Sequence, residues 1–155
     1  MRKIGQKELA ELLIDNKENM YRLAYSILKN DADAQDAVGE TIVAAFEKRS
    51  QLRKPESAKA WIMQILVNKA RSIGMRGKRT VLSDDLEQME AGTVFQYDEL
   101  WPIVMELREE YREVIVLYYY AQFSVKDIGK ALKIPVGTVK SRLSRARETL
   151  AKEIR

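Results

Sequence analysis

Residues 135–154 contain an apolar repeat that constrains the fold more than any other part of the chain. Apolar side chains recur there at steps of three and four residues, the period of an α-helix that buries one face: Val136, Val139, Leu143, Ala146, Leu150 and Ile154. The opposite side and its flanks carry small, hydroxyl-bearing and basic residues, namely Gly137, Ser141, Arg142, Ser144, Arg145 and Arg147. Such a face suits the major groove of DNA, although an ordinary surface helix with a solvated basic side is the alternative.

The residues just before this helix favour the DNA-binding interpretation. Residues 124–132 have the pattern of a short helix, with Ser124 as its N-cap and Asp127 three residues further on. Pro135 ends the segment 133–135, which must turn because proline cannot continue a helix and restricts the residue before it. A helix, a three-residue turn and a basic second helix predict a helix-turn-helix.

The chain contains neither cysteine nor histidine, which excludes several kinds of chemistry. Disulfides, thiol nucleophiles, imidazole bases and the usual zinc ligands are ruled out together. No paired-carboxylate, phosphate-loop or metal-ligand spacing occurs, so the sequence predicts no catalytic residue, no metal and no cofactor. No apolar run reaches the roughly 18 residues of a membrane span, and the N-terminus lacks a signal-peptide core. We expect a cytoplasmic protein without direct membrane insertion.

Charge is distributed unevenly along the chain. Residues 69–79 carry five basic side chains and no acidic one, whereas residues 80–99 carry six acidic side chains and no basic one. From Lys133 to the end there are seven basic residues against two acidic ones. Two basic clusters separated by an acidic tract predict two contacts with a polyanion, joined by a segment that avoids it. Chance clustering on solvated surfaces is the alternative.

Helical periodicity covers almost everything outside residues 80–99, and no stretch alternates convincingly as a strand. The fold class expected is therefore all-α, with two small helical domains, residues 1–79 and 100–155, joined by a flexible acidic linker, residues 80–99. Asp33 is the expected cap of a helix that runs to about Arg49. A loop is expected at 50–57, followed by a helix from Ala58 to about Gly74 with Trp61 on its apolar side.

The chain resembles the extracytoplasmic-function subfamily of bacterial RNA polymerase sigma factors from about Tyr21 to Leu150. Residues 111–147 carry the strongest resemblance, because they look like the family's fourth region, which reads the promoter −35 element. The resemblance implies contacts with −35 DNA from Thr138, Lys140, Ser141, Arg142, Ser144, Arg145 and Arg147. Ser141 and Arg145 are central on the outward face, whereas Arg142 and Arg147 are expected to hold phosphates and Lys140 either a base or a phosphate.

Residues 33–41 resemble the second-region helix with which the family docks on core RNA polymerase. The resemblance assigns polymerase contacts to Asp33, Asp36, Glu40 and Thr41. Asp33 and Asp36 also favour a helix N-terminus by capping and by the helix dipole. Glu40 lies too far along the helix for capping or the helix dipole to explain it. For Asp33 and Asp36, both polymerase binding and stabilisation of the helix N-terminus remain open.

Residues 57–72 resemble the part of the family that melts and captures the −10 element. Holding an unpaired strand requires cations for its backbone and a pocket for an extruded base. The residues expected to supply them are Arg53, Lys54, Lys59, Asn68, Lys69, Arg71, Arg76, Lys78 and Arg79. Asn68 either bonds a base or caps a turn. Ser72 stands where the family commonly has an acid, so a contact made by that acid is in doubt.

The resemblance implies a dissociable subunit that binds core polymerase, reads the −35 duplex and the −10 single strand, and has no catalysis of its own. It also implies an anti-sigma factor, often membrane-bound, and a linker that threads polymerase. Three alternatives remain: a stand-alone repressor or response-regulator output domain, an enzyme that uses carboxylates or lysine, and a helical adaptor. The first leaves the basic helix 58–79 and residues 33–41 unexplained.

Overall fold

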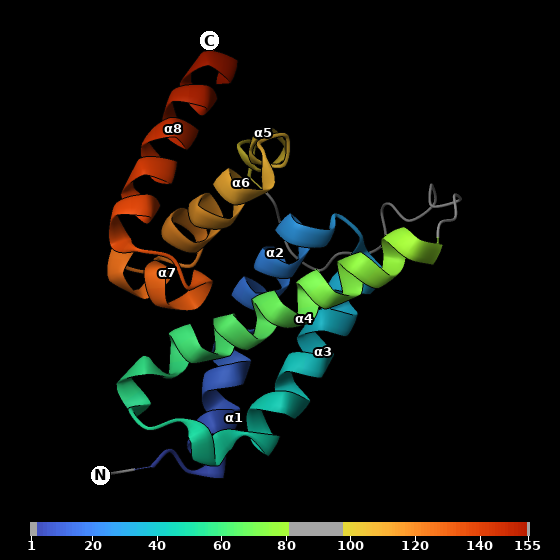
Figure 1. Cartoon of the computed structure of the whole chain (residues 1–155), viewed down its shortest axis with the longest axis vertical. Helices are drawn as coiled ribbons and strands as arrows, with labels where there is room; N and C mark the ends of the chain where they lie inside the picture. The colour runs from blue at the N-terminus through green and yellow to red at the C-terminus, as the bar shows by residue number, and fades with distance from the viewer. Residues whose placement is uncertain (1–2, 81–97, 155) are drawn as a thin grey trace.

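The computed structural model describes residues 3–80 and 98–154, with the side chains of residues 78–80 excepted (Figure 1). These two ranges are helical and contain no strand, which confirms the all-α expectation. The helices are α1 (Gln6–Asp15), α2 (Lys17–Leu28), α3 (Asp31–Glu47), α4 (Ala58–Thr80), α5 (Trp101–Val104), α6 (Glu109–Ile115), α7 (Val125–Leu132) and α8 (Val136–Ile154). Most of the expected acidic linker lies outside the described residues.

Helices α2, α3 and α4 pack on one another and form the core of the N-terminal half (Figure 1). Leucine and methionine side chains from α2 and α4 fill this core and are fully buried, as Met20, Leu23, Met63 and Leu66. Helix α3 contributes mostly alanine to the contact, at Ala34, Ala37, Ala44 and Ala45. Small side chains let the α3 backbone approach its neighbours closely, and this leaves the longer α3 side chains on the surface.

The start of α3 differs from the sequence expectation. Asn30, not Asp33, is the N-cap: its side chain accepts a 2.8 Å hydrogen bond from the backbone N–H of Asp33. Asparagine and aspartate are both strong N-cap residues, so the segment 30–33 offers competing caps. The earlier one extends the helix by a turn, and Asp33 thereby becomes a residue of the first turn.

Helix α4 continues to Thr80, beyond the end expected near Gly74. The predicted loop before it contains two short 3₁₀ turns, Arg49–Gln51 and Pro55–Ser57. Leu52 lies between these turns and is buried, which anchors the loop to the core. The long α4 therefore begins from a fixed loop.

The C-terminal half contains the predicted helix-turn-helix. Ser124 caps α7, because its Oγ accepts a 3.0 Å hydrogen bond from the N–H of Asp127, as expected. Lys133 ends α7 in the left-handed conformation with φ 60°. Gly129 is required for the turn: a Cβ there would lie 2.9 Å from the carbonyl oxygen of Ile134. Helix α8 then begins directly after Pro135.

The two halves of the chain pack against each other. Helix α7 lies across α4, while α6 and the π-helical turn Val116–Tyr120 pack on α2 (Figure 1). Tyr25 of α2 and Trp101 of α5 bring their ring centroids to 6.5 Å across this contact. The sequence predicts two domains on a tether, and it contains no signal for this docking, because the contact joins positions far apart in the chain.

Candidate nucleic-acid interface

The outward face of α8 is open to solvent at the positions that the sequence predicts. Lys140, Ser141, Ser144 and Arg145 are exposed, whereas Val139 and Leu143 on the other side are buried. Thr138 and Arg142 are half-buried. Ser141 and Arg145 line two adjoining shallow hollows, whose other walls include Tyr111. This face therefore presents a hydroxyl and a guanidinium, the donors that suit base edges in a major groove.

Arg147 is held by the protein itself. Its Nε donates a 2.7 Å hydrogen bond to the hydroxyl of Tyr119, and its guanidinium lies over the rings of Tyr118 and Tyr119. The centroids are 5.6 and 5.7 Å away, within the usual range of a cation–π contact. The side chain is nonetheless exposed. The contact of Arg147 with a DNA phosphate stays a prediction. In the structure, Tyr118 and Tyr119 orient its guanidinium group.

A groove lies at the N-terminal end of α4, where the sequence predicts the rim of a base pocket. Arg53 and Lys54 line it from the loop and are exposed, and Trp61 and Gln64 line it from α4 and are half-buried. Trp61 also packs against the hydrophobic core, so it serves both as core and as groove wall. The groove thus combines an aromatic face with nearby cations, which fits an unpaired base and its backbone. Lys130 of α7 lines the same groove.

The remaining predicted −10 residues are distributed along α4. Lys59 and Asn68 are exposed, and Lys69 is half-buried. Arg76 lies 3.8 Å from Glu40 of α3, which links the basic helix to the acidic one. The side chains of Lys78 and Arg79 lie outside the described residues. The structure therefore places the described members on one long helix and the loop that precedes it.

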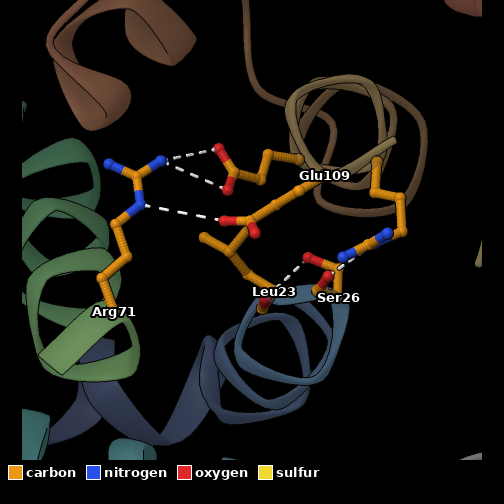
Figure 2. Close-up of polar contacts among 6 residues, drawn as sticks. Leu23, Ser26, Arg71 and Glu109 are labelled. Carbon is orange, nitrogen blue, oxygen red and sulfur yellow. Dashed lines mark hydrogen bonds and ion pairs between the residues drawn. The ribbon is translucent and has the colours of Figure 1, made fainter. Parts of the chain in front are cut away.

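Arg71 is directed toward the other half of the chain (Figure 2). Its Nη2 donates to both carboxylate oxygens of Glu113, at 3.0 and 3.2 Å, and its Nε lies 4.0 Å from Glu109. Glu113 is only 1% exposed. Burial raises the pKa of Glu113 to about 7, and the hydrogen-bonded carboxyl of Glu109 adds to the rise. The attraction of Arg71 acts in the opposite direction and is outweighed by burial.

The acidic side of α3 is a second exposed surface. Asp36, Glu40, Val43 and Glu47 follow at helical spacing and are all exposed, with Val43 at 58%. Asp33 is half-buried; burial raises its pKa, the nearby Asp36 raises it further, and Arg76 acts against both. The exposed Val43 lies next to the predicted polymerase contacts, and sequence reasoning missed it because an isolated valine carries no signal of its own.

Two residues of α3 lie differently from the sequence expectation. Thr41 is fully buried, and its hydroxyl donates a 2.7 Å hydrogen bond to the carbonyl of Ala37. A side chain that is enclosed and satisfied in this way is not available to a partner. Phe46, whose large apolar side chain is of a kind usually found in a core, is 38% exposed. The acidic surface of α3 is therefore defined as Asp33, Asp36 and Glu40 with the adjoining Val43.

Comparison with known proteins identifies the family. The sigma-70 region 2 family matches residues 12–80, and the sigma-70 region 4 family matches residues 97–150. RNA polymerase sigma factor SigV of Bacillus subtilis is 32% identical over 142 residues, which cover 89% of this chain and 86% of SigV. The ECF RNA polymerase sigma factor SigW of the same organism is 26% identical over 174 residues, covering 100% and 93%.

A solved structure shares the fold of this chain over most of its length. It is the sigma factor RpoE from Bartonella quintana in complex with the anti-sigma factor NepR. It superposes with a TM-score of 0.75 at 26% identity, over 95% of this chain and 94% of RpoE. Together these similarities show a promoter-recognising subunit of RNA polymerase. The chain belongs to the extracytoplasmic-function subfamily of sigma factors.

The described ranges contain neither a metal site nor a membrane-spanning helix. The relatives are sigma factors, which are transcription regulators and not enzymes. Among residues 3–80 and 98–154, no group of acidic side chains is arranged to hold a metal ion. Within the same ranges, no helix has the length and apolarity needed to cross a membrane.

Proposed function

We propose that this sigma factor uses three surfaces, one for each of three binding partners. The acidic surface of α3 docks on core RNA polymerase, the groove and cations of 53–79 hold the unpaired −10 strand, and α8 reads the −35 duplex. The protein itself performs no catalysis. The observation that carries this assignment is that one acidic and two basic surfaces are exposed, on α3, on α4 with the loop before it and on α8, each at residues predicted from the sequence.

The chemistry of the two DNA-binding surfaces supports their proposed roles. Arg145 and Ser141 present hydrogen-bond donors to base edges, which gives sequence choice, while Arg142 and Arg147 add phosphate contacts that give affinity and salt dependence. In the groove, Trp61 offers a stacking face for a base, with Arg53 and Lys54 beside it for the strand backbone. Capture of an unpaired base stabilises the melted promoter, because the strand can no longer re-pair.

The experiment that tests this function is run-off transcription. Bacterial core polymerase is combined with the chain on a library of genomic promoters, and transcripts are mapped to their start sites. We expect initiation at a set of promoters that share a −35 and a −10 sequence and that core polymerase alone does not use. Tight binding to core polymerase without promoter-dependent initiation would contradict the proposal.

We also propose that an anti-sigma factor restrains the chain. The support is the similarity in fold to RpoE, whose structure is a complex with the anti-sigma factor NepR. A stand-alone repressor is a poorer account, because it has no use for the region 2 half. The proposal predicts that a small protein co-purifies with the tagged chain from its own cells, and that adding it to the run-off reaction stops transcription.

A further inference from the structure

Two tyrosines of the π-helical turn hold Arg147, whereas carboxylates hold Arg71 and Arg108. The Nε of Arg147 donates a 2.7 Å hydrogen bond to the hydroxyl of Tyr119. Its guanidinium lies 5.6 and 5.7 Å from the ring centroids of Tyr118 and Tyr119. No carboxylate of residues 3–80 or 98–154 forms an ion pair with Arg147. The protein thus fixes this guanidinium without neutralising its charge.

Most of the hydrogen-bond donors of Arg147 stay available. The bond to Tyr119 uses one of the five N–H donors that a guanidinium carries. In the part of the chain that the structure describes, no second acceptor bonds the Nη groups, and the side chain is exposed. The fork of guanidinium N–H groups matches the oxygens of a phosphate, which it binds with two parallel hydrogen bonds. Arg147 therefore keeps both the charge and the donors that a phosphate requires.

The position of Arg147 on α8 favours a phosphate over a base. Arg147 follows Lys140 by seven residues, so the two lie within about 20° of each other around the helix. Both lie on one flank of α8, roughly 100–120° from Ser141 at the centre of the outward face. When such a face enters a major groove, its centre meets base edges and its flanks meet the phosphates that border the groove.

We propose that Tyr119 is a positioning residue for the −35 duplex, because its hydroxyl holds the guanidinium of Arg147 in place for a phosphate at the edge of the major groove. This inference rests on the proposed −35 role of α8. A long side chain loses rotational freedom when it binds DNA, and a hydrogen bond made beforehand within the protein reduces that loss. The side chain of Tyr119 is 48% exposed, so DNA can reach the pair. Its ring and that of Tyr118, with centroids 4.9 Å apart, form an uncharged wall behind the guanidinium.

The test is a double-mutant cycle on the complete holoenzyme. Core polymerase is combined with the wild-type chain, with Tyr119→Phe, with Arg147→Ala or with the double variant. Each holoenzyme is titrated onto a labelled duplex of the most active promoter from the run-off library, and binding is followed by fluorescence anisotropy at several KCl concentrations. Tyr119→Phe removes the hydroxyl that bonds Arg147 and keeps the aromatic ring.

We expect Tyr119→Phe to weaken promoter binding by roughly three- to tenfold in the wild-type background, and by less than about twofold when Arg147 is replaced by alanine. Arg147→Ala should reduce the slope of log K against log salt by about 0.9, the contribution of one phosphate, and Tyr119→Phe should reduce it in the same direction. Urea titration is done in parallel, because a hydroxyl with only a structural role would change stability and leave the salt slope unchanged.

Tyr118→Phe is the matched control. The hydroxyl of Tyr118 forms no hydrogen bond with Arg147, which contacts only the ring of this residue. Any effect of Tyr118→Phe on promoter binding should therefore be the same with Arg147 present and with Arg147→Ala. Coupling to Arg147 as strong as that of Tyr119→Phe would show that the hydrogen bond is not what positions the guanidinium.

Two further results have different meanings. Tyr119→Phe that causes no loss, or an equal loss with and without Arg147, overturns the positioning role and leaves the proposed function standing. Absence of promoter binding by the wild-type holoenzyme on every member of the library contradicts the proposed function itself, and the positioning role falls with it.

Discussion

Arg112 of α6 binds the C-terminal end of α2 through the backbone of Ser26. Its Nε donates a 2.6 Å hydrogen bond to the Ser26 carbonyl, and its Nη1 donates a 2.7 Å bond to the carbonyl of Leu107 (Figure 2 shows the contact with Ser26). Carbonyls in the last turn of a helix have no partner within the helix, so a side chain from elsewhere must satisfy them or water must. Arg112 is 8% exposed and joins the two halves by this bond.

Replacement of Arg112 by methionine is expected to destabilise the chain by roughly 2–4 kcal/mol, because two buried carbonyls lose a charged donor. The free energy of unfolding from urea titration measures the change. Arg108→Met is the matched control. The side chain of Arg108 is 73% exposed, pairs with Glu110 at the surface and lies 5.7 Å from the ring centroid of Tyr111, so its loss is expected to cost less than about 1 kcal/mol. Equal losses in the two variants would contradict the capping role.

Replacement of glycine by alanine is expected to stabilise the chain at one position and to destabilise it at another. A Cβ at Gly39 meets nothing within 4 Å, so Gly39→Ala should raise the free energy of unfolding by about 0.5–1 kcal/mol through helix propensity. A Cβ at Gly129 would lie 2.9 Å from the Ile134 carbonyl oxygen, so Gly129→Ala should lower the free energy of unfolding by roughly 1–3 kcal/mol. Thermal unfolding of both variants checks the pair; stabilisation by Gly129→Ala would refute the tight turn.

Glu113 is expected to make the stability depend on pH. Its pKa is about 7 in the folded chain and 4.5 ordinarily, because burial disfavours the carboxylate. As pH rises between these values, the unfolded chain releases a proton that the folded chain keeps, so stability falls across that window and levels off above it. Below the window both states are protonated and the full stability is present.

Glu113→Gln isolates this contribution from that of the other carboxyls. The variant keeps the shape of the Glu113 side chain and cannot ionise. The difference in free energy of unfolding between variant and wild type should therefore shift in favour of the variant from pH 5 to pH 8, by an amount on the order of a few kcal/mol. Urea titration at both pH values measures the difference. A difference that does not change with pH would show that Glu113 titrates at its ordinary value.

Arg145→Ala is expected to reduce transcription from −35-dependent promoters by about tenfold, because an arginine contact to a base edge contributes ~1–3 kcal/mol. Binding to core polymerase should not change, since Arg145 lies on α8 and not on the acidic surface of α3. Run-off transcription and a core-binding titration provide the two measurements. Lys152→Ala, an exposed change near the end of the same helix, should leave both unchanged.

Charge reversal on α3 is expected to weaken binding to core polymerase and not binding to DNA. Asp36→Lys with Glu40→Lys should weaken binding to core polymerase by more than about tenfold, because like charges then face a basic partner. Single-strand binding should not fall. Glu11→Lys with Asp15→Lys applies the same charge change to exposed positions of α1. If that control weakens core binding equally, net charge and not the acidic surface of α3 is responsible.

Much of the local structure could be predicted from the sequence. The period of three and four residues placed α8, Ser124 marked the start of α7, and Pro135 marked the end of the turn between them, because caps and proline act within a few residues. The exposed −35 face follows from the same periodicity. The cap of α3 was wrong by three residues, because Asn30 and Asp33 are both good caps and a local rule does not choose between them.

The tertiary structure alone decided how the surfaces are related to one another. Thr41 is enclosed because α3 packs by its small residues, and Trp61 is shared between core and groove because the loop of Leu52 folds over α4. The sequence determined the helices, the two basic clusters and the family, since these depend on spacing along the chain. The pairing of Arg71 with Glu113, the cap that Arg112 provides for α2 and the cover of Lys130 over the groove join residues more than 40 positions apart. Such contacts depend on the packing of whole helices, which no local pattern encodes.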